Sequence, residues 1–349
     1  MKNIFIFSDE IGIGKTTTLK EWVKHNVGIT GFLSPLINSE RHFQNIETGE
    51  TQPMETKNEG LEIGKHNFNP EVFEWAEIEI YRQFQSDKKW LVIDEIGPLE
   101  IRKEKGFHQL LLKLFKEYSD EKPNLLFVVR DFMVEEFIEK YDLKKVKILP
   151  KNFFKNQELQ PLKGLVLCGG ESKRMESDKA LLKYSNEIQW KKIRRMLDPF
   201  CNEVAVSVNN VQWKNWASKE EGNFILDAGR FKNNGPFTGL MSANEKFSNT
   251  GFFVVGIDYP YLETRHLVTL FNAREENFDA VCFEKNGFTE PLISIIEENA
   301  TAKLQDFFKN GGNSINQFLK QINTKKVRVS NTDFLTNINH KEDFLKFNS

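Results

Sequence analysis

The sequence contains two separate stretches that each combine a short apolar run, a glycine-rich loop and the start of a helical pattern. The first follows Ile4–Phe7 and reads Asp9-Glu-Ile-Gly-Ile-Gly-Lys-Thr16. The second follows Gly164–Leu167 and continues through Gly169-Gly170 to Lys179. A strand, a glycine loop and a helix in this order open nucleotide-binding α/β domains, and a single domain seldom begins twice. The chain is therefore expected to hold two such domains, one after the other.

Length and charge agree with this expectation. The chain has 349 residues, which is enough for two ordinary cores, and its formal net charge is only -2. A balanced charge gives no indication of a nucleic-acid or membrane partner. The three cysteines lack metal-ligand spacing, and no apolar stretch approaches the roughly 20 residues of a membrane span. We therefore expect a cytoplasmic protein with free thiols.

Buried strands and amphipathic helices alternate in both halves. In the first half, Trp90–Ile93 and Asn124–Val129 are continuous apolar runs, and Phe107–Tyr118 between them has helical spacing. In the second half, Glu203–Val208 and Gly251–Gly256 are equivalent apolar runs. Short apolar strands separated by helices are typical of a parallel sheet covered on both faces.

The fold class predicted from this alternation is α/β, as two three-layer Rossmann-like domains. We expect the first domain at residues 1–150 and the second at residues 162–349. Between them, residues 151–161 are polar and charged and are predicted to be a linker.

The first glycine loop has the core pattern of a phosphate-binding loop. Gly12 and Gly14 allow backbone N–H groups to curl around a phosphate, and the helix that follows favours anions at its N-terminus. Lys15 is expected to reach the β- and γ-phosphates, and Thr16 to hold Mg²⁺ through its hydroxyl. Thr17 belongs to the same predicted nucleotide-binding segment.

A phosphate loop of this kind needs an acidic residue at the end of a buried strand, and Asp94-Glu95 after Trp90–Ile93 meets that need. Asp94 is predicted to hold Mg²⁺, and Glu95 to orient or activate an attacking water. Separately, the two motifs could be a helix-capping turn and a solvated strand end. Together, in this order, they favour nucleotide hydrolysis. Arg130, at the end of a later strand, could sense phosphate, but an ordinary surface contact is expected instead.

Residues 1–150 resemble the THEP1-like nucleoside triphosphatases. The resemblance rests on Gly12–Leu19, Gly31–Pro35 and above all Asp94-Glu-Ile-Gly-Pro-Leu-Glu100. It implies a P-loop NTPase fold that binds ATP or GTP and hydrolyses nucleoside triphosphates with loose base preference.

One residue departs from the usual phosphate-loop pattern. Asp9 stands five residues before Gly14, where that pattern has glycine. A carboxylate beside phosphates is unfavourable unless it points away, and a side chain can fit that backbone poorly. The sequence therefore predicts weakened nucleotide binding in the first domain unless the Asp9 side chain is turned out of the site.

The second glycine loop has residues suited to an α-phosphate. Gly169 and Gly170 let the backbone approach a nucleotide closely, because a Cβ would intrude. Lys179 is predicted to neutralise the α-phosphate as it is attacked, a role that needs a compact and mobile cation. Asp178 is expected to fix the loop rather than to bind metal. The predicted nucleotide contacts of this loop are Leu167, Cys168, Gly169, Gly170 and Arg174, and Cys168 is not expected to act as a nucleophile.

Acidic residues follow two later strands of the second half. Asp227 closes the strand Phe224-Ile-Leu226, and Asp258 lies just past Gly251–Gly256. Ligands of open α/β sheets bind at the C-terminal edge of the strands. Asp258 is therefore predicted to hold Mg²⁺ beside a triphosphate.

Residues 162–349 resemble the MobA family of molybdenum cofactor guanylyltransferases. The motifs that carry the resemblance occur in the family's order: Leu167–Met175, Asp178–Leu182, Asn209, Asp227, Gly235–Leu240, Asp258–Leu262, Glu290–Leu292, the helical pair in Leu304–Leu319, and Asn337–Asn339. The resemblance implies a nucleotidyltransferase fold that binds GTP on the second loop. The terminal phosphate of molybdopterin, or of Mo-molybdopterin, would attack the α-phosphorus and expel pyrophosphate.

The resemblance also implies roles for individual residues. Asn209 and Asp227 would hold the nucleoside, Asp258 would hold Mg²⁺, and Asn337 and Asn339 would contact the pterin side. Molybdenum-cofactor insertion proteins would be further partners. Glu176, which follows Met175 where the family has glycine, implies either a rebuilt turn or weaker triphosphate binding.

Three alternatives remain open at this point. The second domain could be a related transferase that uses CTP on the same pterin or acts on a sugar phosphate, although Gly169-Gly170 fits the guanylyl branch better. The first domain could be a non-hydrolysing partner, as Asp9 suggests. The whole chain could also be a regulatory nucleotide binder with two decayed sites, although it keeps Lys15 and Lys179.

Overall fold

The computed structural model describes residues 4–10, 12–64, 66–169, 178–184 and 187–338. The chain divides into two compact units, residues 1–157 and 158–349. Within the segment expected to be a linker, residues Lys151–Lys155 form the short 3₁₀ helix η2, and Phe154 belongs to the core of the first unit. In the described ranges, no helix is long and apolar enough to cross a membrane.

The first unit is built on an eight-stranded sheet with a parallel centre. The strand order is β10-β1-β9-β8-β2-β4-β3, and β5 pairs with β4. The strands from β10 to β2 are parallel, whereas β4 runs antiparallel to β2, β3 and β5. The bounds are β1 Ile4–Phe7, β2 Ile29–Leu33, β3 Leu36–Ile37, β4 Glu40–Asn45, β5 Thr51–Pro53, β8 Trp90–Ile96, β9 Asn124–Val129 and β10 Val146–Ile148. A separate hairpin is formed by β6 Leu61–Ile63 and β7 His66–Phe68.

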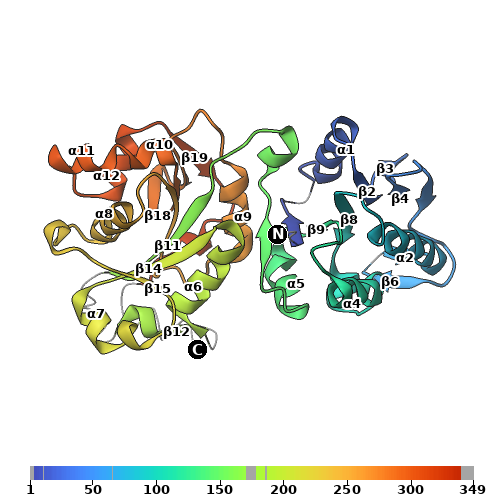
Figure 1. The fold of residues 1–349 in the computed structure, drawn as a ribbon, viewed down its shortest axis with the longest axis horizontal. Coiled ribbons are helices and arrows are strands. Elements are labelled where there is room, and N and C mark those ends of the chain that lie inside the picture. Colours follow the sequence, from blue (N-terminus) through green and yellow to red (C-terminus); the bar gives the residue numbers. More distant parts are fainter. Residues whose placement is uncertain (1–3, 11, 65, 170–177, 185–186, 339–349) are drawn as a thin grey trace. The chain divides into compact units, whose positions relative to one another are not determined.

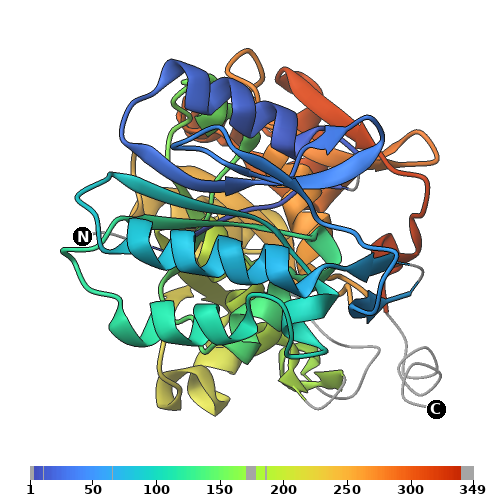
Figure 2. The ribbon, with the colours of Figure 1, turned by 90° about the vertical axis from the view of Figure 1, so that its right-hand side faces the viewer.

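Helices cover both faces of this sheet. Helix α1 (Lys15–His25) buries Leu19 and Trp22 against one face, in a cluster with Phe7 and Trp90. On the other face, the Phe127 ring contacts aromatic rings of α4 (His108–Glu117) and α5 (Val134–Lys140). Helix α2 (Pro70–Phe84) lies with α4, as Figure 2 shows, while α1 lies on the opposite side of the sheet. The unit is a three-layer α/β domain, with a mixed rather than a wholly parallel sheet.

Strand β8 is longer than the sequence predicts. The apolar run predicts an end at Ile93, but the strand continues through Asp94 and Glu95 to Ile96. Its pairing with β9 is interrupted between Ile93 and Ile96, and Glu95 takes a left-handed φ of 70°. This irregularity is a β-bulge, which turns a side chain away from its regular direction. The two carboxylates are thus part of the strand end rather than a solvated tail after it.

The second unit has a seven-stranded mixed sheet in the order β15-β14-β11-β16-β18-β17-β19. The strands from β15 to β16 are parallel, β18 runs antiparallel to both neighbours, and β19 is parallel to β17. The bounds are β11 Leu162–Leu167, β14 Glu203–Val208, β15 Asn223–Leu226, β16 Gly251–Gly256, β17 Ala280–Lys285, β18 Phe288–Ile296 and β19 Thr324–Arg328. The continuous apolar runs of β11, β14 and β16 place them at or beside the centre, where both faces are buried.

Helices cover both faces of the second sheet as well. Helices α8 (Pro236–Lys246), α11 (Leu304–Lys309) and α12 (Ile315–Gln321) contribute to one apolar cluster with the sheet. On the opposite face, Phe253 contacts the rings of Phe200 and Phe271, the latter on α9 (Thr264–Asn272). Helix α6 (Gln189–Leu197) packs on β11 and β14, and Figure 1 shows it on the side of α9. The expected fold class, two three-layer α/β domains, is confirmed.

Candidate active sites

The first glycine loop joins β1 to α1. Gly12 and Gly14 have φ values of 85° and 82°, a left-handed conformation that strongly favours glycine. A Cβ on Gly12 would meet nothing within 4 Å, so backbone conformation, rather than space, requires glycine there. Gly14 is also the residue that precedes the first turn of α1. The loop therefore presents the N-terminus of an 11-residue helix to the pocket beside it.

Lys15 is held over this loop by the backbone that precedes it. Its Nζ donates hydrogen bonds to the carbonyl oxygens of Asp9 and Glu10, at 2.7 and 2.9 Å. Burial lowers the pKa of Lys15, and nearby carboxylates, led by Asp9, act in the opposite direction. The ammonium group is thus placed at the loop before any ligand binds.

The Asp9 carboxylate is turned out of the phosphate site. Its Oδ1 accepts a hydrogen bond from the N–H of Glu10 at 2.9 Å, and its Oδ2 lies 3.9 Å from Nζ of Lys151. Asp9 is buried and does not line the pocket at the loop. It is also absent from the described residues with positive φ, so a side chain does not strain the backbone there. The sequence left open whether the Asp9 side chain points toward the phosphate site or away from it. In the structure it points away from that site.

Thr16 and Asp94 meet at the bottom of the site. The Thr16 hydroxyl donates to Asp94 Oδ2 at 2.9 Å, and the Ser34 N–H donates to the same oxygen at 2.9 Å. The other oxygen, Oδ1, is buried without a hydrogen-bond partner among the described residues. Burial, followed by the charge of Glu95, raises the pKa of Asp94 to about 6. A buried carboxylate with one unpartnered oxygen beside a threonine hydroxyl suits a divalent cation.

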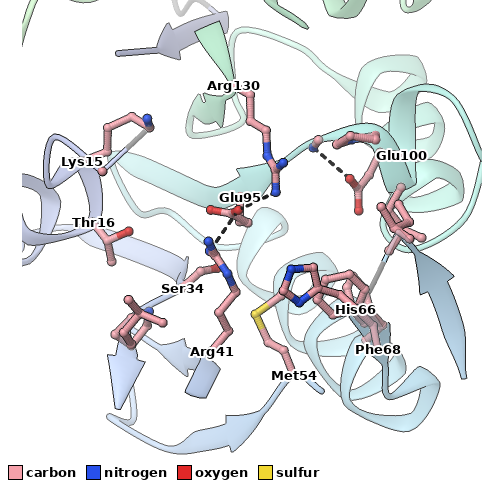
Figure 3. A pocket seen from close by; sticks show the side chains of 18 of the residues that line it. Lys15, Thr16, Ser34, Arg41, Met54, His66, Phe68, Glu95, Glu100 and Arg130 are labelled. Atoms are coloured by element: carbon pink, nitrogen blue, oxygen red, sulfur yellow. Dashed lines mark hydrogen bonds and ion pairs between the residues drawn. The ribbon is translucent and has the colours of Figure 1, made fainter. Parts of the chain in front are cut away.

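Glu95 forms ion pairs with two arginines. Its Oε1 lies 2.9 Å from Arg41 Nη1 and 3.1 Å from Arg130 Nη2. The expectation of an ordinary surface contact for Arg130 is wrong, because Arg130 lines the same pocket as Lys15. Arg41 had no sequence signal, since it comes from the antiparallel strand β4 and belongs to no motif. Figure 3 shows both guanidinium groups directed at Glu95.

These residues line one pocket of about 550 Å³. The lining includes the phosphate-loop residues and the side chains of Leu36, Met54, Ile63, His66, Phe68, Phe73 and Leu99. Glu100 also lines the pocket, but its carboxylate accepts hydrogen bonds from the N–H groups of Gly97 and Phe107. Burial raises the pKa of Glu100 to about 7. In Figure 3, Glu95 lies between Lys15 and Thr16 on one side and His66 and Phe68 on the other.

In the second unit, the glycine loop leaves the end of β11. Leu167 and Cys168 are buried there, and burial raises the pKa of the Cys168 thiol well above its usual range, as expected for a non-nucleophile. A Cβ on Gly169 would lie 2.9 Å from Asp227 Oδ2, so close approach requires glycine at this position. Gly170, Arg174, Glu176 and Asn339 lie outside the described residues.

Asp178 anchors the far side of this loop. Its Oδ1 accepts hydrogen bonds from the Ala180 N–H and from Gln212 Nε2, each at 3.0 Å, and its Oδ2 accepts one from Trp216 Nε1 at 2.8 Å. Three donors on one carboxylate leave it a fixing role, as predicted from the sequence.

Lys179 and Asp258 meet at the C-terminal ends of the parallel strands. Lys179 Nζ lies 3.0 Å from Asp258 Oδ1 and donates to the Ile338 carbonyl at 3.1 Å. The Ile338 N–H in turn donates to the backbone carbonyl of Asp258 at 3.0 Å. The structure thus brings together three segments: the 3₁₀ turn Lys179–Leu181, the loop after β16, and the chain near Ile338.

Asp227 and Asn209 lie in different local settings. Burial raises the pKa of Asp227, although the Ser207 hydroxyl, which donates to Asp227 Oδ1 at 2.5 Å, lowers it. Asn209 caps helix α7 (Asn210–Asn215), where its Oδ1 accepts the N–H groups of Val211 and Gln212. Asn209 thus has a structural task in addition to the role implied by the resemblance.

Tyr259, to which the sequence assigned no role, lies directly beside Asp258. It is fully buried, and its hydroxyl is hydrogen-bonded to Glu290 Oε1. Burial raises the pKa of Tyr259 well above its usual range, an effect that a hydrogen bond with Asn337 opposes. A single tyrosine that follows an aspartate has no recognisable sequence signal, which is why sequence reasoning missed it.

Few described protein groups could contact a metal ion at either place. Across the described ranges, no three or more His, Cys, Asp or Glu side chains are grouped so as to hold a metal ion. Asp94 with Thr16, and Asp258 by itself, each offer a partial ligand set. Mg²⁺ commonly binds to one or two protein oxygens together with water and substrate phosphates, so both places fit that type of site.

Comparison with known proteins identifies both units. Residues 164–327 match the family model of the MobA-like NTP transferase domain, and residues 3–159 match the NTPase family model. The "Molybdenum cofactor biosynthesis bifunctional protein" of Synechocystis sp. is 27% identical over 212 residues, 59% of this chain and 59% of that protein. The chain therefore matches less than two thirds of that relative.

Two further proteins are each matched over almost their whole length. The "Molybdenum cofactor guanylyltransferase" of Campylobacter jejuni subsp. doylei is 27% identical over 194 residues, 55% of this chain and 98% of that protein. The crystal structure of THEP1 from Aquifex aeolicus has a TM-score of 0.36 and 22% identity, and the match covers 44% of this chain and 95% of that one. From the two family matches, the chain consists of an N-terminal NTPase-family domain followed by a MobA-like NTP transferase domain.

Proposed function

We propose that this chain is a bifunctional protein of molybdenum cofactor biosynthesis. Its second unit would transfer GMP from GTP to molybdopterin or Mo-molybdopterin and release pyrophosphate. Its first unit would bind and hydrolyse ATP or GTP. The observation that carries the transferase proposal is the pairing of Lys179 with Asp258 at the C-terminal edge of the parallel strands, inside a MobA-like domain.

The geometry suggests how the transfer would proceed. The terminal phosphate of molybdopterin is already an anion, so its attack on the α-phosphorus needs no general base. A new phosphorus–oxygen bond forms as the bond to the pyrophosphate oxygen breaks. Lys179 would leave its partners and neutralise the charge that develops on the α-phosphate. Asp178, held by three donors, would keep the Lys179 turn in place.

The nucleoside would lie near Gly169 and Asp227. A Cβ at position 169 would lie only 2.9 Å from Asp227 Oδ2, so this part of the site has no room for a side chain at that position. We propose that Asp227 and Asn209 orient the nucleoside, and that Leu167, Cys168, Gly170 and Arg174 complete the nucleotide contacts. Asn337 and Asn339 would face the pterin side. Insertion proteins that receive the finished dinucleotide are the proposed partners.

A divalent cation, for which we propose Mg²⁺, would offset the charge of the phosphates in both units. Asp258 would hold it in the second unit, and Thr16 with Asp94 in the first. The unpartnered Oδ1 of Asp94 supports the latter assignment. A cytoplasmic location belongs to the same proposal, because nucleoside triphosphates are abundant there.

In the first unit, Gly12, Gly14, Lys15 and Thr17 would bind the phosphates. Glu95 would orient the attacking water, and Lys15 would neutralise charge on the γ-phosphate. Arg41 and Arg130, both paired with Glu95, would be available to a γ-phosphate placed beside it. The outward orientation of Asp9 removes the main objection to nucleotide binding here.

The test uses the full chain with molybdopterin, Mg²⁺ and GTP, CTP or ATP. Pyrophosphate release and the mass of the pterin dinucleotide are measured together. We expect a guanine dinucleotide from GTP and at least about tenfold less product from CTP or ATP, the discrimination of a few hydrogen bonds to the base. If a cytosine dinucleotide were the main product, the proposed activity would be cytidylyl transfer instead of guanylyl transfer. Tight GTP binding without either product would favour a regulatory binder.

A further inference from the structure

The pocket of the first unit extends beyond its phosphate loop. Hydrolysis needs room there for the phosphates of the nucleotide and for one water molecule, which occupies about 30 Å³ in the liquid. The pocket has a volume of about 550 Å³, which is in the range of small-molecule sites. Its apolar half is defined by the lining side chains Leu36, Met54, Ile63, His66, Phe68, Phe73 and Leu99. Of these, His66 and Phe68 lie beyond Glu95 as seen from Lys15 and Thr16 (Figure 3).

The nucleotide itself has another place for its nucleoside. Thr17 lines this pocket and also lines a second pocket of about 390 Å³, on the other side of the start of α1. The second pocket is lined by the exposed Asn156 and by the edges of Trp22 and Phe154, which are otherwise buried. A nucleotide with its γ-phosphate at Lys15 would run past Thr17 if its nucleoside lay in this second pocket. The apolar half of the first pocket is then left for a different molecule.

The lining of the apolar half indicates which molecule fits. The His66 and Phe68 rings are stacked, with an interplanar angle of 19° and centroids 6.1 Å apart, and the ring of a ligand could extend this stack. The charged groups there already have partners. His66 Nδ1 lies 3.1 Å from Glu55 Oε1, and both oxygens of Glu100 accept backbone N–H groups. A neutral ring compound therefore suits this surface better than an anion.

Glu95 lies between the apolar half and the phosphate loop. Its left-handed φ of 70° is unusual for a residue other than glycine, and such conformations concentrate at functional sites. A hydroxyl group on a compound in the apolar half would face both this carboxylate and a γ-phosphate held by Lys15. Arg41 and Arg130 are close enough to Glu95 to contact the same phosphoryl group.

We propose that the first unit is a phosphotransferase, in which a neutral, ring-bearing alcohol occupies the apolar half and accepts the γ-phosphoryl group. This inference rests on the proposed nucleotide binding of that unit. The alcohol oxygen forms a bond to the γ-phosphorus while the bond from that phosphorus to the β,γ-bridging oxygen breaks. The alcohol proton passes to the Glu95 carboxylate, and the nucleoside diphosphate leaves. Hydrolysis is the same step with water in place of the alcohol.

The test uses the full chain, Mg²⁺ and ATP labelled at the γ-phosphate. The probes are adenosine, guanosine, cytidine, uridine and pyridoxine, each a neutral ring compound with a primary hydroxyl. Labelled inorganic phosphate and labelled organic phosphate are separated and counted. We expect at least one probe to yield labelled organic phosphate, at a rate that saturates with probe concentration and is lost in Glu95→Gln.

A variant that fills the apolar half tests whether the acceptor alcohol binds in that part of the pocket. Leu36 is 67% exposed, so Leu36→Trp can add an indole without disturbing the core. We expect the ratio of organic to inorganic phosphate to fall at least about tenfold, because misplacing a reacting group by about 1 Å can cost about 10²-fold. Ile78→Trp is the matched control, since Ile78 is 63% exposed on α2 and does not line the pocket. It should leave the ratio unchanged.

The outcomes separate this inference from the proposed hydrolysis. Lys15-dependent release of inorganic phosphate without organic phosphate from any probe overturns the phosphotransferase and leaves the hydrolase. Organic phosphate that forms equally in Leu36→Trp and wild type also overturns the inference, because the acceptor then lies elsewhere. Neither product in any reaction overturns both proposals. Organic phosphate with little inorganic phosphate supports the transferase and shows that water is a poor competitor.

Discussion

The phosphate site of the first unit and the transfer site of the second are assembled over different distances along the chain. Lys15 is held by the carbonyls of Asp9 and Glu10, which precede it by five or six residues. Lys179 is held by Asp258 and by the Ile338 carbonyl, 79 and 159 residues away. The first lysine is therefore positioned by its own loop, whereas the second depends on the folding of its whole unit.

The two carboxylates that we propose as metal ligands also differ, in their burial and in their hydrogen-bond and ion-pair partners. Asp94 is buried, has one unpartnered oxygen and has a pKa raised to about 6. Asp258 is already paired with the lysine that we place in catalysis. On this proposal, the first site could take a cation before nucleotide binds, whereas in the second a cation and Lys179 would compete for one carboxylate. Substrate phosphates would resolve that competition by drawing Lys179 away.

Removing Lys179 should have the largest effect. We expect Lys179→Ala to lower the rate of pyrophosphate release about 10²- to 10³-fold, the usual loss when one stabilising group is removed from a developing anion. Hydrolysis by the first unit should be unchanged. Lys183→Ala, at an exposed position on β12 (Lys183–Tyr184), is the control. A loss of less than threefold would show that another cation neutralises the α-phosphate.

Glu95→Gln should lower nucleoside triphosphate hydrolysis about 10²-fold or more, because the amide cannot take a proton and pairs weakly with Arg41 and Arg130. Nucleotide binding, measured by calorimetry with a non-hydrolysable analogue, should remain. Exposed Glu59 on the same unit provides the control Glu59→Gln. If hydrolysis persists, Glu95 does not orient the water.

Asp94→Asn should stabilise the first unit in the absence of metal and nucleotide. The pKa of Asp94 is raised from 3.8 to about 6, so above pH 6 the folded state holds a charge that burial disfavours. This penalty is present in full above the folded pKa and fades as the pH falls toward 4. We expect the variant to gain about 1–2 kcal/mol in the free energy of unfolding at pH 8 and almost nothing at pH 4.

Hydrogen exchange of β8 in urea at the two pH values measures this gain within the first unit. Exposed Asp87 gives the control Asp87→Asn, for which no difference is expected. Adding Mg²⁺ and ADP should reverse the order of stability, because only the wild type can bind the cation through Asp94. If Asp94→Asn and the wild type were equally stable at both pH values, burial would not disfavour the charged form of Asp94.

Asp9→Gly should have the smallest effect. The Asp9 carboxylate is directed at Glu10 and Lys151 and does not line the pocket. We expect kcat/KM for hydrolysis to change by less than about threefold, because the charge is not aimed at the phosphates. An increase in kcat/KM of tenfold or more would show that the Asp9 carboxylate does repel the nucleotide. The first unit's phosphate loop would then be less favourable to phosphates than its geometry indicates.

The sequence predicts these two sites unequally well. Asn124–Val129, Glu203–Val208 and Gly251–Gly256 are strands with the predicted bounds, because an uninterrupted apolar run leaves little choice in a sheet buried on both faces. The phosphate loop was also predictable, since its residues are contiguous. Strand β8 was predicted too short, because a carboxylate pair at a β-bulge looks like the start of a loop.

Contacts between distant segments were harder to predict. Arg41 reaches Glu95 from a short antiparallel strand that has no hydrophobic alternation. Lys179 binds a backbone carbonyl at Ile338, and any residue there would offer the same group. The orientation of Asp9 depends on Lys151, which the sequence analysis had placed in a linker. Such contacts depend on tertiary geometry, which spacing along the chain does not encode.

The central claim is that one chain carries two separate phosphate-handling sites, one for the γ-phosphate and one for the α-phosphate. The most direct test measures inorganic phosphate and pyrophosphate together from GTP and molybdopterin in wild type, Lys15→Ala and Lys179→Ala. We predict that Lys15→Ala loses inorganic phosphate and keeps pyrophosphate, and that Lys179→Ala does the reverse. Loss of both products in either variant would contradict the claim.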